Sequence, residues 1–475
     1  MKKQEIRVNR EKWDKMEEEC GVLAVYSGKV RDDMVRIAYY GLYALQHRGQ
    51  ESAGITLCDS VTEGRIRHKT IKNMGLVSDV LKEKDMSSYV GNILIGHIRY
   101  STTGVSEVEN CHPLRGNSAM GKISLAHNGN LINIREIKRE LMEEGSLFQT
   151  TTDTEIILKL LGRNARHGYR QALLNTLEKI EGAFALVIII GNKLIGVRDP
   201  QGIRPLCLGR TADGLYILAS ESCALDTLGG EFVRDIEPGE MIIIDNGMIE
   251  SVKYRENAVK APCSFEYIYF ARPDSIIDGM DVYSVRHKAG KALYRQNPIE
   301  ADLVIGVPDS GIPAAIGFSE ASGIPYGTAL VKNKYIGRTF ISPSQEMRER
   351  AVKVKLNPMK SLIEGKRVVV VDDSLVRGTT SRILIKILYE SGAKEVHFRS
   401  ASPVVKSECY FGVDIAGKKE LIGSFMEVDE IREEIGATTL EYLTLDNLRK
   451  ILKGNEFCMG CFTGEYPLVN REIQE

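Results

Sequence analysis

Two adjacent carboxylates followed by hydroxyl residues form the most informative string of this 475-residue chain. The valines at 368–371 predict a strand buried on both faces, as in a parallel sheet. Asp372 and Asp373 come at the carboxyl end of that strand, where open α/β sheets bind their ligands. Gly378 and the hydroxyl residues at 379–381 can open the next helix, whose N-terminal N–H groups can bind a phosphate.

The paired carboxylates cannot favourably contact that phosphate, so they are better placed on sugar hydroxyls or on Mg²⁺. The two acids, next to a helix N-terminus that can bind phosphate, predict a site for a phosphorylated ribose. A bare Asp-Asp-Ser string is equally compatible with a solvated strand-to-helix turn that has an acidic cap. The competing nucleotide motifs GxxxxGK[ST] and GxGxxG are missing from the chain.

The composition restricts the class of protein. A chain of 475 residues predicts two domains, and a net charge of −1 argues against a dedicated nucleic-acid binder. The longest apolar stretch, at 183–190, is far shorter than the roughly 20 residues that a membrane span needs. Residues 1–19 are rich in charge and have no apolar core of a secretory signal, so we expect a cytoplasmic protein. Nine cysteines then indicate catalytic or metal-binding thiols rather than a disulfide framework.

The pattern of apolar residues divides the chain into two regions. Up to about residue 252, short strands with hairpin signals alternate with helices, which is an α+β pattern. The clearest strands lie at 183–190 and 194–198, and helices are expected at about 31–46, 133–144, 153–166 and 169–180. From about 301 the order becomes strand, loop and helix, at 302–307, 308–313 and 314–321, which predicts a βαβ-type parallel domain. The polar stretch 254–260 is the expected boundary.

Cys20 follows two glutamates and opens a predicted strand. A buried cysteine in such a place is usually a small hydrophobic residue. However, QHRGQESAGI at 46–55, GHIRYSTTG at 96–104 and HNGNL at 127–131 resemble, in order, the motifs of N-terminal-nucleophile glutaminase domains. The string at 368–381 resembles the phosphoribosyl-diphosphate (PRPP) signature of type I phosphoribosyltransferases.

Together these motifs resemble the amidophosphoribosyltransferase family from Cys20 to Pro467, including the strings at 197–206, 265–275 and 332–340. The resemblance implies a propeptide at 1–19 and an α+β (αββα) glutaminase domain at 20–255. It also implies an α/β phosphoribosyltransferase domain with a parallel sheet at 256–453 and a cluster-binding tail at 454–475. The implied reaction uses ammonia from glutamine to displace pyrophosphate from PRPP and gives 5-phospho-β-ribosylamine, the entry step of purine biosynthesis. Feedback inhibition by purine nucleotides and a homo-oligomer, a tetramer or a dimer, are further expectations from the family.

The resemblance assigns the glutamine-hydrolysing residues. Cys20 would be the nucleophile, and its freed α-amino group would be the base, which requires removal of residues 1–19. Asn128 and the Gly129 N–H would stabilise the oxyanion, and Arg99 and Asp153 would bind the α-carboxylate and α-ammonium of glutamine. The plain alternatives are an exposed turn for Asn128 and Gly129 and a helix-capping role for Asp153.

The resemblance also assigns a PRPP site. The loop at 306–311 would face the diphosphate, although alone it fits an ordinary β-α turn. A loop at 332–343 would close over the substrate and exclude water. The implied PRPP-binding residues are Asp372, Asp373, Ser374, Arg377, Gly378, Thr379, Thr380, Lys332 and Arg338, and the implied Mg²⁺ ligands are Ser310, Asp372 and Asp373.

Cys458 and Cys461 have metal-ligand spacing. From spacing alone, a zinc site, a [4Fe–4S] cluster and a structural C-x-x-C remain open. The resemblance to the iron–sulfur branch of the family favours a [4Fe–4S] cluster on Cys263, Cys409, Cys458 and Cys461. The remaining cysteines, Cys58, Cys111, Cys207 and Cys223, are interpreted as packing residues.

Two other functions are compatible with parts of this pattern. A non-catalytic PRPP-sensing regulator would have the phosphate site, but such proteins usually lack a glutaminase half. An amidotransferase with another acceptor, such as a sugar phosphate, would have the Cys20 motifs but would lack the PRPP string.

Overall fold

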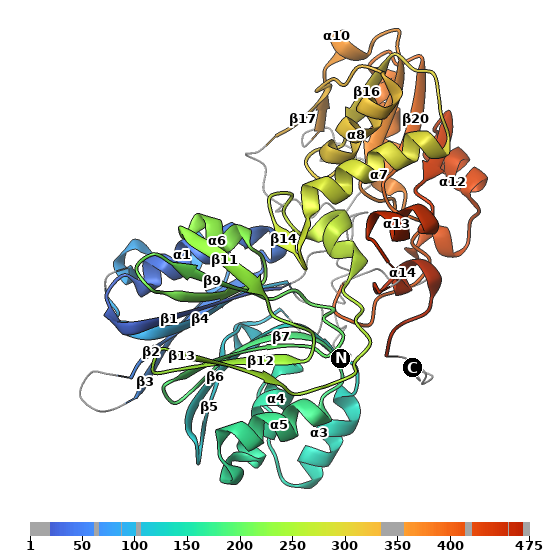
Figure 1. The fold of residues 1–475 in the computed structure, drawn as a ribbon. Helices are drawn as coiled ribbons and strands as arrows, with labels where there is room; N and C mark the ends of the chain where they lie inside the picture. Colours follow the sequence, from blue (N-terminus) through green and yellow to red (C-terminus); the bar gives the residue numbers. More distant parts are fainter. Residues whose placement is uncertain are drawn as a thin grey trace, which may run out of the picture.

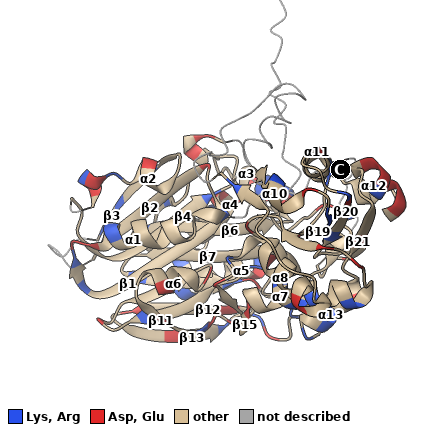
Figure 2. Ribbon diagram, turned by 90° about the horizontal axis from the view of Figure 1, so that it is seen from above, with Lys and Arg blue, Asp and Glu red and all other residues tan. Residues whose placement is uncertain are grey.

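The computed structural model describes residues 20–60, 66–86, 88–100, 106–333, 356–413, 420–454 and 456–468. Figure 1 shows a broad pair of sheets built by the first half of the chain and a smaller sheet flanked by helices in the second half. Both signs of charge are spread over both halves (Figure 2), as expected for a net charge of −1.

Seven antiparallel strands form the first sheet, in the order β11-β9-β10-β1-β4-β2-β3. Their bounds are β1 (Gly21–Arg31), β2 (Ser52–Asp59), β3 (Arg67–Met74), β4 (Gly91–Arg99), β9 (Cys207–Thr211), β10 (Tyr216–Ala219) and β11 (Gly230–Asp235). Successive side chains of β1 point to opposite faces, and both faces are buried. Val22 and Ala24 enter the core between the two sheets, whereas Leu23 and Val25 pack in the core under α1 (Met34–Ala44).

Six antiparallel strands form the second sheet, in the order β13-β12-β8-β7-β6-β5. They are β5 (Leu114–Ser118), β6 (Gly121–Leu131), β7 (Gly182–Ile190), β8 (Lys193–Arg198), β12 (Glu240–Asp245) and β13 (Met248–Lys253). The predicted hairpin of 183–190 and 194–198 is therefore confirmed as β7 and β8.

Helices cover the outer face of each sheet (Figure 1). The first sheet is covered by α1, α2 (Val77–Val80) and α6 (Cys223–Thr227), and the second by α3 (Ile134–Glu143), α4 (Thr154–Arg163) and α5 (Tyr169–Lys179). The four helices predicted in this half are confirmed as α1, α3, α4 and α5, with ends that differ by a few residues. The result is the expected αββα arrangement.

The second half contains a parallel sheet in the order β16-β19-β20-β21. Its strands are β16 (Leu303–Gly306), β19 (Arg367–Asp372), β20 (Glu395–Ser400) and β21 (Thr439–Tyr442). The valines of β19 are buried on both faces, as predicted: Val369 and Val371 belong to one core and Val368 and Val370 to the other.

Helices on both sides complete this half: α7 (Val282–Gln296), α8 (Ile312–Ser322), α10 (Lys360–Ile363), α11 (Thr379–Glu390), α12 (Val428–Ile435), α13 (Leu445–Ile451) and α14 (Gly460–Thr463). Two small antiparallel sheets pair β14 (Ile276–Ile277) with β15 (Met280–Asp281) and β17 (Leu330–Lys332) with β18 (Leu356–Pro358). The predicted strand, loop and helix order near residue 302 is confirmed by β16 and α8.

Buried ion pairs join the two halves. Arg48 of the sandwich donates to Glu266 at 2.6 Å, at the start of a π-helix (Glu266–Phe270). Arg198 at the end of β8 forms a two-point pair with Asp278, at 2.7 and 2.9 Å. Removing one partner of a buried pair leaves an uncompensated charge, so these contacts constrain how the halves are joined.

Candidate functional site

Cys20 lies directly before β1, and Asn128 lies on β6 of the other sheet. Ser220 links the start of β1 to Asn128, because its Oγ accepts a hydrogen bond from Val22 N at 2.9 Å and one from Asn128 Nδ2 at 3.5 Å. The Cys20 carbonyl accepts a hydrogen bond from Arg48 Nε at 3.2 Å. The start of β1, which Cys20 precedes, and the Asn128 side chain therefore lie at the same end of the sandwich.

Asn128 and Gly129 lie within β6 and pair with Ala185 and Phe184 of β7. Asn128 is buried and its Oδ1 has no hydrogen-bond partner in the described structure. Gly129 has φ of 141°, and a Cβ there would lie 2.0 Å from the Ala183 carbonyl oxygen. The alternative of an exposed turn is therefore wrong, and position 129 requires glycine.

Asp153 is the residue before α4, but its side chain forms no capping hydrogen bond. It accepts a hydrogen bond from Leu131 N at 3.1 Å, and its Oδ1 lies 3.4 Å from His127 Nδ1. Burial acts to raise the pKa of the Asp153 carboxyl, but His127 and these hydrogen bonds hold it below its usual value. The capping alternative is wrong, and a buried carboxylate faces the Cys20 region.

Burial raises the pKa of the Cys20 thiol to about 12, although Arg99 and Arg204 act to lower it. Arg99 is buried at the end of β4, and Arg204 is buried near the end of β8. A thiol with such a pKa is protonated at neutral pH, so it needs a base to become a nucleophile.

Sequence reasoning missed Arg204, Arg48 and Glu221 as parts of this region. Glu221 contacts Arg48 and lies 2.7 Å from His47 Nε2, and it accepts hydrogen bonds from Arg272 N and Ser275 Oγ of the second half. Both arginines lie inside strings that resemble family motifs, at 46–55 and 197–206, which was the signal available.

A second group of polar residues lies at the carboxyl end of β19. Asp372, Asp373 and Ser374 are all buried, and Ser374 Oγ donates to Asp373 Oδ1 at 2.6 Å. Ser310, on the loop after the neighbouring strand β16, donates to Asp373 Oδ2. The alternative of a solvated turn is wrong, because both acids are enclosed between two parallel strands.

The helix α11 begins at Thr379, directly after this group. Gly378 occupies the left-handed region (φ 80°, ψ −9°) at its N-cap, and Thr379 and Thr380 form its first turn. An N-terminal helix turn offers unpaired N–H groups to an anion. Acids, a hydroxyl and a helix N-terminus therefore meet, as the sequence predicted.

The remaining predicted PRPP residues lie around this edge. Lys332 Nζ contacts Asp309 Oδ2 at 2.6 Å, and Arg377 lies 3.1 Å from Glu420. Arg338 lies outside the described residues.

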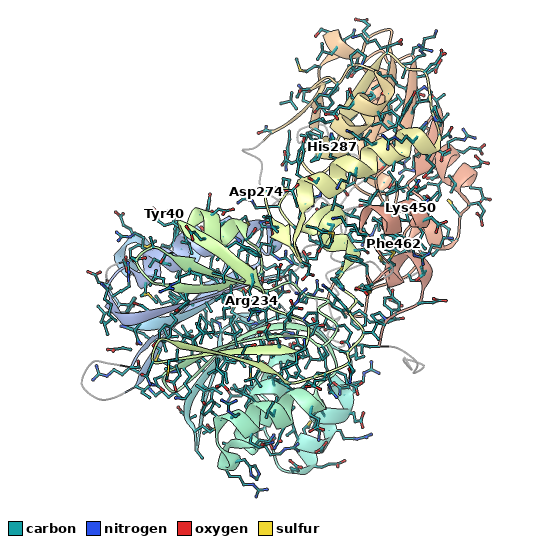
Figure 3. The ribbon with its side chains drawn as sticks, in the orientation of Figure 1. Tyr40, Arg234, Asp274, His287, Lys450 and Phe462 are labelled. Carbon is teal, nitrogen blue, oxygen red and sulfur yellow. The ribbon has the colours of Figure 1, made fainter. Side chains whose placement is uncertain are left out.

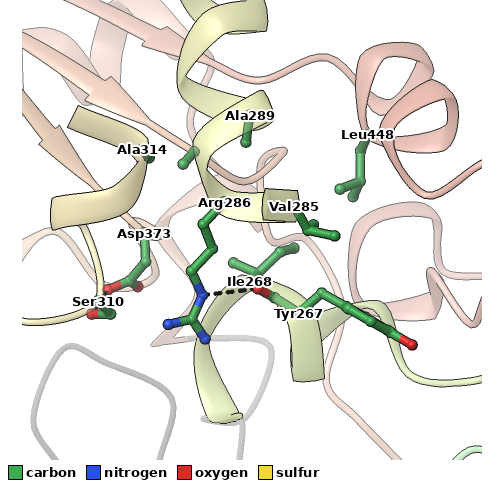
Figure 4. A pocket seen from close by; sticks show the side chains of 10 residues that line it. Tyr267, Ile268, Val285, Arg286, Ala289, Ser310, Ala314, Asp373 and Leu448 are labelled. Atoms are coloured by element: carbon green, nitrogen blue, oxygen red, sulfur yellow. Dashed lines mark hydrogen bonds between the residues drawn. The ribbon is translucent and has the colours of Figure 1, made fainter. Parts of the chain in front are cut away.

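A small cavity of about 10 Å³ adjoins the Asp373–Ser310 pair. Figure 4 shows Arg286 of α7 between Asp373 and the π-helix, donating from Nε to the Tyr267 carbonyl at 2.9 Å. Its Nη2 donates to the carbonyls of Tyr269 and Ala271 at 2.9 and 2.7 Å. Burial lowers the pKa of Arg286 to about 10, which Asp373 partly offsets. Arg286 connects the acidic group to the segment that carries Glu266.

The four cysteines predicted to hold a cluster come together from three segments. Cys263 and Cys458 form an isolated parallel bridge, with Cys458 N donating to the Pro262 carbonyl at 2.9 Å. Lys406 N and Ser407 N donate to the Cys461 carbonyl, which brings the segment before Cys409 to the tail. Phe462 stacks on Phe265 with ring centroids 5.6 Å apart, and Figure 3 shows it in the second half of the molecule.

Burial controls the protonation of this cysteine group. Burial raises the pKa of Cys461 well above its ordinary value, and Cys458 and Cys409 raise it further. Burial likewise raises the pKa of Cys458 to about 12. Neutral thiols are stable there, and a metal ion would be needed to keep them as thiolates. Soft sulfur ligands in this number suit zinc or an iron–sulfur cluster.

Metal-ligand geometry itself is not preformed. Within the described ranges, no group of three or more His, Cys, Asp or Glu side chains is arranged to hold a metal ion. The predicted Mg²⁺ ligands are two carboxylates and a hydroxyl, and their oxygen chemistry suits Mg²⁺. The other four cysteines, Cys58, Cys111, Cys207 and Cys223, are buried, as predicted for packing residues.

Comparisons with known proteins match both halves. The family model for a glutamine amidotransferase domain matches residues 97–227, and that for a phosphoribosyl transferase domain matches residues 279–415. The amidophosphoribosyltransferase of Methanocaldococcus jannaschii is 49% identical, covering 94% of this chain and 97% of its own. The chain belongs to the amidophosphoribosyltransferase family. The Bacillus subtilis member of this family is 45% identical, covering 95% of this chain and 94% of its own.

Solved structures of the family agree. One described as the allosteric regulatory enzyme of purine biosynthesis has a TM-score of 0.88 at 45% identity, covering 94% of this chain and 96% of that one. The glutamine PRPP amidotransferase from B. subtilis, complexed with ADP and GMP, has a TM-score of 0.88 at 43% identity and covers 96% of this chain and 98% of that one. No helix in the described part of the chain has the length and apolar character required to span a membrane.

Proposed function

We propose that this chain transfers ammonia from glutamine to PRPP and forms 5-phospho-β-ribosylamine, glutamate and pyrophosphate, the first step of purine (IMP) biosynthesis. The observation that carries this proposal is that one chain holds two polar groups. In the first, Ser220 links the strand that Cys20 precedes to Asn128, and in the second, Ser310 and Asp373 pair beside a helix N-terminus. Neither group alone would perform the complete reaction.

In the glutamine half, the Cys20 thiol attacks the side-chain amide of glutamine. The α-amino group of Cys20, freed by removal of residues 1–19, accepts the thiol proton and passes it to the leaving ammonia. Water then hydrolyses the thioester left on Cys20, which releases glutamate and restores the thiol. This base is needed because burial raises the pKa of the thiol to about 12. Asn128 Nδ2 and Gly129 N donate to the oxyanion, while Arg99 and Asp153 hold the charged groups of the substrate.

In the transferase half, ammonia attacks C1 of the ribose and pyrophosphate leaves with inversion. Asp372 and Asp373 hold the ribose side, and Ser374, Arg377 and residues 378–380 hold the 5′-phosphate. The loop at 306–311 faces the diphosphate. Lys332 and Arg338 act as charged clamps of the loop that closes over PRPP, and this closure keeps water from competing with ammonia. Bound Mg²⁺, held by Ser310, Asp372 and Asp373, would neutralise charge on the leaving diphosphate.

We propose a [4Fe–4S] cluster on Cys263, Cys409, Cys458 and Cys461. Support comes from the gathering of the four cysteines from three segments of the chain. Protein purified without oxygen should be brown and contain about four irons per chain. Stoichiometric zinc without iron would contradict this assignment.

The leader is proposed to be removed before activity, leaving a glutaminase domain at 20–255, a transferase domain at 256–453 and a tail at 454–475. Trp13 is the single tryptophan of the chain and lies in the leader. Active protein should therefore lack tryptophan emission and have an intact mass that begins at Cys20. A fully active preparation with the mass of residues 1–475 would rule out the N-terminal-nucleophile mechanism.

Regulation and assembly follow the same proposal. The B. subtilis relative was solved with ADP and GMP, which supports inhibition of this chain by purine nucleotides in the cytoplasm. A homo-oligomer, a tetramer or a dimer, is proposed from the family alone.

One assay tests the proposed function. Purified protein given glutamine, PRPP and Mg²⁺ should release glutamate and pyrophosphate in equal amounts, and ammonia should replace glutamine for pyrophosphate release. Binding of PRPP without turnover would favour a regulator. Glutamate release that depends on another phosphorylated sugar would favour a different acceptor.

A further inference from the structure

The segment that follows Cys409, residues 410–412, lies directly against the strand that carries Asn128 and Gly129. The Tyr410 carbonyl accepts a hydrogen bond from Asn130 Nδ2 at 2.9 Å. The Phe411 carbonyl accepts one from the Arg204 guanidinium. Both donors belong to the sandwich, and both acceptors are backbone atoms of the transferase half.

Gly412 brings the two backbones into contact. Its φ is 100°, and a Cβ at this position would lie 3.0 Å from the Gly129 carbonyl carbon and 2.9 Å from Arg204 Nη2. On its other side, Gly129 has no room beside the Ala183 carbonyl oxygen of β7. Gly129 therefore packs closely against both β7 and Gly412, and an added carbon on either glycine would meet backbone atoms.

The far side of the segment is held by the C-terminal tail. The Tyr466 ring packs against Tyr410 and Phe411, with centroids 5.0 and 5.8 Å away, and its hydroxyl donates to the Glu408 carbonyl. Phe411 N donates to Cys409 Sγ at 3.3 Å. Residues 410–412 thus lie between the cysteine group and Gly129.

We propose that residues 410–412 are a positioning segment for amide hydrolysis, which fixes the Gly129 N–H and the Arg204 guanidinium relative to Cys20. The inference rests on the proposed function, because it assigns a role within the glutamine reaction. Oxyanion donors act only when they are aligned in advance, and a misplacement of about 1 Å can cost about 10²-fold in rate. The transferase half, with its cysteine-bearing tail, therefore contributes part of the support for the glutamine site.

Gly412→Ala tests this directly. The added methyl must displace Gly129 or Arg204, so kcat for glutamine hydrolysis should fall about 10- to 100-fold with little change in KM. Ammonia-dependent pyrophosphate release should stay at the wild-type rate. Gly436→Ala is the matched control: Gly436 also has a positive φ, 74°, at the end of α12, but nothing lies within 4 Å of its would-be Cβ. It should leave both activities unchanged.

Asn130→Ala gives a second variant that adds no bulk. It removes the hydrogen bond to Tyr410 and should lower glutamine kcat in the same direction but by less. In the double variant, the fold reduction in kcat for glutamine hydrolysis should be smaller than the product of the reductions in the two single variants, because both changes act on the same contact.

Three results would overturn the proposal. The first is wild-type glutamine kcat in folded Gly412→Ala, and the second is an equal fall of both activities together with a lower melting temperature. If Gly412→Ala does not fold, wild-type kcat in Asn130→Ala is the third. Failure of the proposed function is distinguishable, since wild-type protein would then release no pyrophosphate from PRPP and ammonia.

Discussion

The two centres of this chain are built in different ways. The acidic group with its helix N-terminus comes from one continuous string, residues 372–380, completed by Ser310 from the loop after the neighbouring strand β16. The glutamine centre is assembled from separate elements: Cys20 before β1, Arg99 on β4, Asn128 on β6 and Asp153 before α4. A parallel strand delivers its ligands at one end, whereas an antiparallel sandwich must bring distant strands into register.

This difference also affects how each centre is held. The acids at the end of β19 are fixed by their own neighbours, such as Ser374. The glutamine centre depends on contacts from outside its sandwich, including Arg48 with Glu266 and the packing of Gly412 on Gly129. We expect the first centre to be self-contained and the second to be sensitive to changes in the other half.

The largest expected effect comes from Cys20→Ala. Glutamine-dependent turnover should fall by at least about 10³-fold, because no other nucleophile replaces the thiol. Ammonia-dependent pyrophosphate release should continue, since the acidic group is separate from Cys20. Cys58→Ala is the matched control, because Cys58 is a buried packing thiol of β2 and should retain both activities. Loss of both activities in a folded Cys20→Ala protein would contradict the separation of the two centres.

The opposite effect is expected from Asp373→Asn. Pyrophosphate release should fall by about 10²- to 10³-fold with either nitrogen source, because the carboxylate is lost from the proposed site for the ribose and Mg²⁺. Slow glutamine hydrolysis without PRPP should remain. Asp302→Asn changes an acid at the amino end of the same strands, where Asp302 pairs with Arg367 at 3.0 Å, and should have little effect. Unchanged transferase kinetics in Asp373→Asn would argue against the assignment.

The contrast between the centres explains what the sequence could predict. The sequence predicted the buried valines of β19, the acids after them and the start of α11, because strand burial and the start of a helix depend on local sequence. The hairpin of β7 and β8 was predicted from two apolar runs separated by a turn.

The residues of the glutamine centre could be predicted only from the resemblance to the family motifs. Nothing local indicates that Ser220 links β1 to Asn128, since this depends on the packing of one sheet on the other. For the same reason the roles of Arg204 and of residues 410–412 could not be predicted: their contacts span more than 200 residues of sequence. The arrangement of a buried side chain across two sheets is set by tertiary packing rather than by local pattern.

The smallest expected effect is a loss of folding stability at acid pH, which also distinguishes the sandwich from the second half. Burial lowers the pKa of His68 to about 4 and that of His97 to about 3, and both lie in the sandwich. In the unfolded chain these groups bind protons near pH 6.5, whereas in the folded chain they stay neutral to lower pH. Their protonation therefore leaves the free energy of unfolding unchanged well above pH 6.5 and lowers it as the pH falls toward 4. For His68 alone this linkage amounts to about 2 kcal/mol between pH 7 and pH 5.

Urea unfolding at pH 7 and pH 5 would measure this linkage. His68→Gln should reduce the loss of stability on acidification, whereas His167→Gln, at an exposed surface position, should not. Burial lowers the pKa of three histidines of the sandwich, His68, His97 and His112, and of His397 in the second half. Because the sandwich has more of these groups, brief exposure to pH 5 should abolish glutamine-dependent turnover before ammonia-dependent turnover. Equal loss of both activities would mean that the halves unfold as one unit, and that the buried pairs of Arg48 and Arg198 bind them too tightly to separate.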